Sequence, residues 1–138
     1  MRVLLDTNIL LDVLLRRVPH VDESTAALLR CRAVRAEIWI AWHGLATAYY
    51  FLRRGRSLDE AMRDVDRLLG WAVVAPVVDA DARRARDFGF TDFEDALQAV
   101  AAERCEANWL VTRNTADFAN SPVLAITPAE FLQSVPAP

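Results

Sequence analysis

The chain has 138 residues, of which 54% are hydrophobic and 25% are charged, and its formal net charge is −3. This length and composition predict one soluble globular domain over residues 1–134 and exclude a disordered chain. The acidic balance argues against a protein that holds nucleic acid by a broad basic surface, but it allows an enzyme that meets nucleic acid at one local site. All 16 basic residues are arginine, which excludes every mechanism that needs a lysine.

Targeting and redox signals are few. No apolar run is long enough to span a membrane, and Asp6 interrupts the short apolar stretch at the N-terminus, so we expect neither a membrane segment nor a signal peptide. Cys31 and Cys105 form no CxxC pair, which predicts free buried thiols in a reducing cytoplasm. The proline-containing end, residues 135–138, is expected to fray.

Short apolar runs alternate with helical patterns along the whole chain. In chain order, we expect a strand at 2–6, helices at 7–16 and 22–35, a strand at 37–41, helices at 43–54 and 57–69, a strand at 71–75, helices at 79–89 and 91–106, a strand at 108–112, a helical turn at 115–119, a strand at 123–126 and a helix from 127. Most of these strands are apolar throughout. The pattern therefore predicts an α/β fold with a central, mainly parallel five-stranded sheet covered by helices on both faces.

Local signals mark the helix ends. Capping boxes begin at Ser57, Thr91 and Thr127, each with Glu three residues later, and Asp79 is expected to cap a further helix. Three glycines follow expected helices, where a left-handed residue is favoured: Gly55, Gly70 and Gly89.

Sites in open α/β sheets form at the carboxyl ends of the strands. The polar residues expected there are Asp6, Thr7 and Asn8 after the first strand, Asp92, Glu94 and Asp95 at the start of the helix before the fourth strand, and Thr112, Arg113, Asn114 and Asp117 after it. Carboxylates that are brought together stay ionised only with a cation, and oxygen ligands suit Mg²⁺ or Mn²⁺. Such ions polarise phosphates and activate water.

Each acid also has a purely structural interpretation. Asp6 can simply cap the helix that follows it, the acids from Asp92 to Asp95 are favourable charges at a helix N-terminus, and Asp117 alone is a surface residue in a turn. However, Asp92 and Asp95 are three residues apart and so share a helix face. We therefore interpret the three segments together as a metal site.

This chain lacks residues that several other classes of α/β protein require. The first strand runs into Asp6-Thr7-Asn8 rather than into the glycine-rich turn of a dinucleotide-binding fold or a P-loop. Phosphatases of the haloacid dehalogenase type and receiver domains need a lysine. His20 and His43 form no triad with an obvious Ser or Cys, and the isolated Cys and His residues do not predict zinc.

Three segments resemble signatures of the PIN-domain family: VLLDTNILLD, FTDFEDALQA and LVTRNTADF. The resemblance covers essentially the whole chain in the expected order. It implies a PIN-like three-layer sandwich and a metal-dependent ribonuclease similar to VapC-type toxins of toxin–antitoxin pairs. Such toxins are commonly dimeric and are inhibited by a small antitoxin protein.

Carried over by position, the resemblance implies a role for each polar residue. The implied catalytic metal ligands for Mg²⁺ or Mn²⁺ are Asp6, Asp95 and Asp117, with Asp92 beside them; Thr7, Asn8, Thr112 and Asn114 are implied as supporting residues. Arg113, Arg53 and Arg54 are candidate contacts for RNA phosphates. For Arg53 and Arg54, a solvated helix end is the equally good alternative.

The third helix departs from the family pattern. VapC toxins carry a Glu there, whereas the matching position here is Thr47, and no acid lies between Ile38 and Arg56. Losing one carboxylate weakens the expected metal affinity and leaves two hypotheses. The first is a ribonuclease, and the second is a degenerate PIN domain that binds RNA or protein without cutting. Part of the aromatic cluster around Trp42 and Tyr50 is expected to form a dimer or partner face.

Overall fold

A single five-stranded sheet forms the centre of the computed structural model, which describes all 138 residues. The strands are β1 (Arg2–Leu5), β2 (Glu37–Ile40), β3 (Val73–Val74), β4 (Trp109–Val111) and β5 (Ala125–Ile126). Their order across the sheet is β3-β2-β1-β4-β5, and every neighbouring pair is parallel. All carboxyl ends therefore lie at the same edge of the sheet, with β1 in the middle.

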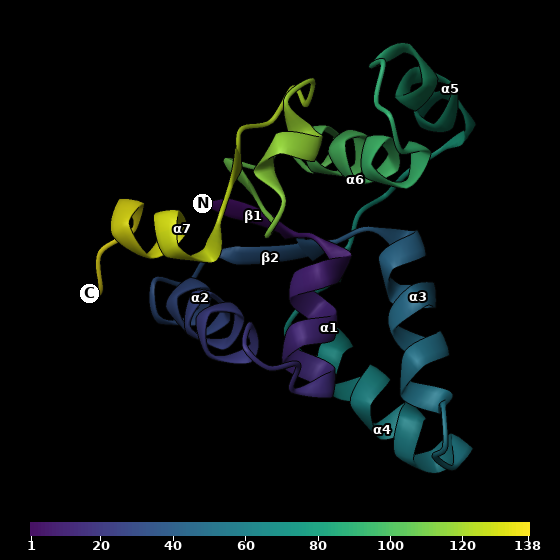
Figure 1. Cartoon of the computed structure of the whole chain (residues 1–138), viewed down its shortest axis with the longest axis vertical. Helices are drawn as coiled ribbons and strands as arrows, with labels where there is room; N and C mark the ends of the chain where they lie inside the picture. The colour runs from purple at the N-terminus through teal and green to yellow at the C-terminus, as the bar shows by residue number, and fades with distance from the viewer.

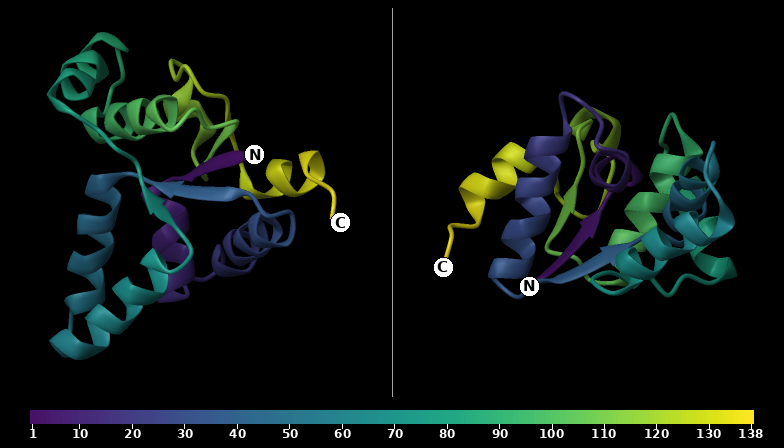
Figure 2. Two further views of the ribbon diagram at one scale, coloured as in Figure 1. Left: turned by 180° about the vertical axis from the view of Figure 1, so that it is seen from behind. Right: turned by 90° about the horizontal axis from the view of Figure 1, so that it is seen from below.

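Helices cover both faces of this sheet, which confirms the expected three-layer α/β arrangement. They are α1 (Thr7–Leu15), α2 (Val21–Ala33), α3 (Trp42–Arg53), α4 (Leu58–Leu69), α5 (Asp79–Asp87), α6 (Phe93–Arg104) and α7 (Pro128–Ser134), with a short 3₁₀ helix, η1 (Thr115–Phe118). Figures 1 and 2 show α5 and α6 on one side of the sheet and α1 to α4 on the other, while α7 packs beside α2. No helix combines the length and the apolar character needed to cross a bilayer.

Alternate residues of β1 supply the two cores of the sandwich. Val3 and Leu5 pack in the cluster that includes α1 and α2, whereas Leu4 packs in the cluster that includes α6. All three side chains are at most 1% exposed. A strand that is buried on both faces needs apolar residues at every position, which explains the continuous apolar run in the sequence.

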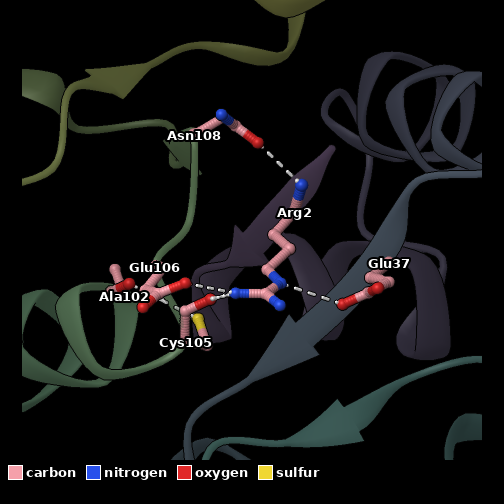
Figure 3. Close-up of polar contacts among 6 residues, drawn as sticks. All are labelled: Arg2, Glu37, Ala102, Cys105, Glu106 and Asn108. Carbon is pink, nitrogen blue, oxygen red and sulfur yellow. Dashed lines mark hydrogen bonds and ion pairs between the residues drawn. The ribbon is translucent and has the colours of Figure 1, made fainter.

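At its amino end, β1 is tied to its neighbours by Arg2 (Figure 3). The Arg2 guanidinium donates to Glu37 at 3.1 Å and to Glu106 at 2.6 Å, and its backbone N–H donates to Asn108 Oδ1 at 2.8 Å. These exposed ion pairs contribute little stability on their own. They do leave the acids at this edge paired, in contrast to those at the carboxyl edge.

Several helix ends differ from the expectations. The capping boxes at Ser57 and Thr127 are confirmed, but the N-cap of α6 is Asp92 rather than Thr91, because the Asp92 carboxylate reaches the N–H of Glu94 at 2.8 Å. The helix α5 begins at Asp79, so Val78 is its N-cap, and the Val78 N–H donates to Asp81 Oδ2 at 2.8 Å.

Two expectations about chain ends and glycines are also corrected. Gly55 and Gly89 have positive φ values of 70° and 71°, as expected, but Gly70 does not, because its N–H still bonds to Asp66 O in a helical turn at φ −74°. Val135 is not frayed. It is 7% exposed, packs in the α1–α2 core and accepts a hydrogen bond from Arg30, so any loose tail begins after it.

We expect α7 to stabilise the fold through Phe131, which is fully buried with its ring 5.8 Å from that of Trp109. Phe131→Ala should lower the free energy of unfolding by about 3–5 kcal/mol, because it leaves a cavity in the core. Urea denaturation measures this. The exposed Leu124 provides the control, since Leu124→Ala should change stability by less than about 0.5 kcal/mol. Equal losses in the two variants would contradict the prediction.

Candidate functional site

Asp6 stands in the middle of the carboxyl edge, directly after β1. Its backbone N–H donates to Val111 O at 3.0 Å, and its carbonyl oxygen accepts from the N–H of Ile9 and of Leu10, so its backbone links β4 to the start of α1. Its side chain is 1% exposed and makes no capping bond to the helix. Asp6 occupies the N-cap position of α1, but without that bond helix capping does not account for the burial of its carboxylate.

Two side chains hold the Asp6 carboxylate in place. Oδ2 accepts a hydrogen bond from Thr112 Oγ1 at 2.7 Å and another from Asn8 Nδ2 at 2.9 Å. The Thr112 hydroxyl oxygen in turn accepts from the backbone N–H of Asn114 at 3.1 Å, which leaves its proton for Asp6. Asn8 and Thr112, which we expect to be supporting residues, both contact the Asp6 carboxylate, whereas Asn114 contributes its backbone N–H.

Burial makes the ionised form of Asp6 costly. It raises the pKa of Asp6, repulsion from Glu94 raises it further, and the hydrogen bonds from Thr112 and Asn8 oppose both effects. A carboxylate in this setting favours either a proton or a nearby cation.

Three further acids surround one cavity at this edge. The cavity has a volume of about 420 Å³, and its lining includes Asp92, Asp95 and Asp117. The structure thus brings together the start of α6 and the η1 turn, as the sequence analysis expected. Asp92 also keeps its structural role, because its carboxylate is the N-cap of α6.

Asp95 lies among the other carboxylates of the site. Burial, followed by repulsion from Asp6 and then from Asp92, Glu94 and Asp117, raises the pKa of Asp95 to about 6. The site therefore carries an excess of negative charge that no arginine neutralises at Asp95.

The donor atoms of this site are the kind that hard divalent ions prefer. They are carboxylate oxygens with threonine and asparagine nearby, and neither cysteine nor a histidine pair is present to favour zinc. No three His, Cys, Asp or Glu side chains are close enough together to hold an ion as they stand. Mutual repulsion among the carboxylates around Asp95 works against closer approach until a cation is bound.

Thr7 and Arg113 contact residues other than Asp6. Thr7 donates to Glu94 Oε1 at 3.4 Å rather than to Asp6. Arg113 turns inward, with Nε 3.3 Å from Asp12 Oδ2, and its Nη2 donates to Asn8 Oδ1 at 3.4 Å. Arg113 therefore steadies Asn8, and only the rest of its guanidinium is left for a phosphate.

Arg53 and Arg54 lie at the far end of α3 from the acids. The helix starts at Trp42, next to the carboxyl end of β2, and its 12 residues span about 18 Å. Arg53 donates to the Arg56 carbonyl, and the Arg54 guanidinium lies 6.0 Å from the centre of the Phe51 ring. The structure does not bring these two arginines to the acidic edge.

Sequence reasoning missed Asp12, and it placed Glu94 at the candidate edge without giving it a role as a ligand. Asp12 is 0% exposed and accepts a hydrogen bond from Ser24 Oγ at 2.9 Å as well as pairing with Arg113. Its position in the otherwise apolar stretch from Ile9 to Leu15 was the available signal, because an acid in such a stretch is buried only with a partner.

We expect the Thr112 hydroxyl to be important for stability. Thr112→Val leaves the buried Asp6 oxygen with one donor fewer and should lower the free energy of unfolding by about 1–3 kcal/mol. The measurement is urea denaturation at pH 7. Thr25→Val, on the partly exposed face of α2, is the matched control and should have little effect. A loss no larger than that of the control would show that the contact is dispensable.

The raised pKa of Asp95 predicts a pH dependence. Its folded-state pKa of about 6 lies above the usual value of 3.8, so the folded state binds this proton more tightly than the unfolded state. Its contribution to stability is then fully present below about pH 4 and decreases as the pH rises to about 6. Carbon-13 NMR of the carboxyl group in the presence of EDTA should show a midpoint near 6, which Asp6→Asn should lower. A midpoint near 4 in the wild type would contradict this account.

Comparison with known proteins places this architecture in a family. A sequence profile described as PIN domain matches residues 2–116. No curated protein matches the chain at the level of sequence. Among solved structures, VapBC2 from Rickettsia felis, bound to a DNA fragment from its promoter, has a chain that is 20% identical with a TM-score of 0.71, and the match covers 92% of this chain and 98% of that one.

Two other structures show the same fold. VapBC-1 from nontypeable Haemophilus influenzae is 14% identical with a TM-score of 0.74, over 94% of this chain and 99% of that one. FitAcB from Neisseria gonorrhoeae is 17% identical with a TM-score of 0.67, over 92% and 98%. At these identities the likeness concerns the fold, and the profile match over most of the chain carries the assignment. The chain belongs to the PIN domain family.

Proposed function

We propose that this protein is a ribonuclease that depends on a divalent metal ion and hydrolyses phosphodiester bonds in RNA. The observation that carries the proposal is Asp6, a buried carboxylate that makes no capping hydrogen bond to α1 and is held by Thr112 and Asn8 at the carboxyl edge. A charge that the fold keeps in so costly a position needs a partner, and a cavity at the same edge of the sheet is lined by three more acids.

We assign metal binding to the acids of this edge and their orientation to neighbouring polar residues. Asp6, Asp95 and Asp117 would hold Mg²⁺ or Mn²⁺, with Asp92 beside them. The bound ion would orient the scissile phosphate and lower the pKa of an attacking water. Thr112 and Asn8 keep Asp6 oriented, so that little side-chain entropy is lost when the ion binds. The acidic net charge is no obstacle, because RNA approaches an edge whose negative charge the ion has reduced.

A protein partner is the second part of the proposal. Exposed apolar side chains, Trp42 at 65%, Tyr50 at 63% and Met62 at 40%, lie on α3 and α4. A hollow of about 340 Å³ between the two helices has an entirely apolar lining that includes Trp42 and Met62. The similar chains were solved as VapBC and FitAB assemblies. We propose that this chain is likewise the cytoplasmic toxin of a toxin–antitoxin pair, and that the apolar surface of α3 and α4 contacts the antitoxin or a second copy.

A non-catalytic role as an RNA- or protein-binding module is the alternative. It is favoured by Thr47, which stands on α3 where VapC toxins carry a Glu, and by the lack of a ready-made group of three ligands. The two functions differ in one respect that is simple to measure, because only the enzyme cuts RNA in the presence of a divalent ion.

We expect the purified protein to cleave single-stranded or structured RNA with Mn²⁺ or Mg²⁺ and not with EDTA. Asp6→Asn should lower the cleavage rate by at least roughly 10–100-fold, the size of effect that even indirect changes to metal sites produce. Asp59→Asn, on the exposed surface of α4, is the control and should cleave like the wild type. Equal cleavage by Asp6→Asn would indicate a contaminating nuclease. No cleavage of any RNA, together with no metal binding by calorimetry, would favour the binding module.

A further inference from the structure

We propose that Glu94 is a metal-site acid of this protein, supplied by α6 in place of the carboxylate that α3 lacks. This inference rests on the proposed function and adds to it a residue that would complete the ion-binding set. It also accounts for how a chain with Thr47 on α3 can still assemble an ion site.

The Glu94 carboxylate lies where three helices meet. Its Oε1 accepts from Thr7 Oγ1 on α1 at 3.4 Å and from Gln98 Nε2 on α6 at 3.3 Å, and it lies 3.2 Å from His43 Nε2 on α3. Thr7 is the neighbour of Asp6, so these contacts bring Glu94 to the same edge.

The side chain that α3 places next to Glu94 is the His43 ring and not an acid. His43 and Thr47 are four residues apart and so lie one above the other on α3. The helix also comes very close to α1, since a Cβ on Gly44 would lie 2.8 Å from Thr7 Oγ1. An acid at position 47 would thus lie one helical turn from His43, which contacts Glu94.

The buried side chain of Gln98 donates a hydrogen bond to Glu94. Gln98 is 0% exposed, and its Nε2 donates to Thr7 Oγ1 as well as to Glu94, while its Oε1 has no partner. Burying an amide with an unpartnered oxygen is costly. We infer that the fold tolerates this cost because the amide holds the Glu94 carboxylate in position.

Helix capping does not explain the orientation of Glu94. The N-cap bond of α6 comes from Asp92, whose carboxylate accepts the Glu94 N–H. The Glu94 side chain instead contacts α1 and α3. All of its hydrogen bonds are to Oε1, so Oε2 is available to an ion. Because the side chain is 47% exposed, it has room to move toward Asp95 when the ion binds.

The test is Mn²⁺ binding by isothermal titration calorimetry, with no RNA present. We expect Glu94→Gln to weaken Mn²⁺ binding by roughly 10–100-fold, while Glu23→Gln, which removes one exposed acid from α2, leaves it unchanged. Adding Thr47→Glu to the Glu94→Gln protein should restore most of the affinity, because it returns an acid to the same region from α3. Thermal melts with EDTA check that each variant is folded, and Glu94→Asp serves if Glu94→Gln is not.

The outcomes separate this inference from the proposed function. Wild-type affinity in Glu94→Gln, together with lost binding in Asp95→Asn, overturns the role of Glu94 and leaves the metal site intact. Weakened binding that Thr47→Glu does not restore overturns the replacement of an α3 acid by Glu94. No Mn²⁺ binding by the wild type overturns the proposed function itself, and this inference with it.

Discussion

The burial of one carboxylate at the end of the central strand is the constraint on which this structure depends. Asp6 follows β1, which has a parallel neighbour on each side, so its side chain emerges where both cores end and where little water can reach it. Only Thr112 and Asn8 donate to it through their side chains. The surrounding segments are arranged around that charge, because an unpaired buried carboxylate would otherwise destabilise the fold.

Acidic side chains at the amino end of the sheet are paired with an arginine, whereas those at the carboxyl edge are not. At the amino end, Arg2 pairs with both Glu37 and Glu106 on the surface and so reduces the negative charge there. At the carboxyl edge, the nearest arginine, Arg113, is drawn away by the buried Asp12. The acids around Asp95 therefore keep their mutual repulsion.

Much of the fold could be predicted because its signals are local. The capping boxes at Ser57 and Thr127 depend on atoms within three residues, and both form as expected. The expectations were wrong where two local structures were possible and a nearby residue favoured the other one. Thr91 yields the N-cap to Asp92, and Gly70 stays helical because the chain continues a helical turn before it enters β3. The strand at 71–75 shrinks to Val73–Val74, since an edge strand pairs on one side only.

Periodicity along the chain was enough to predict the α/β architecture and the polar residues expected where strands end, because both signals lie in neighbouring residues. The resemblance to PIN domains then singled out Asp6, Asp95 and Asp117 among these acids. Only the tertiary structure decided what each side chain does there. It set Arg113 against Asp12, placed Arg53 at the far end of α3 and turned Glu94 toward His43. Those choices depend on contacts between helices distant in the chain, and neither spacing nor composition encodes such contacts in a form that one sequence reveals.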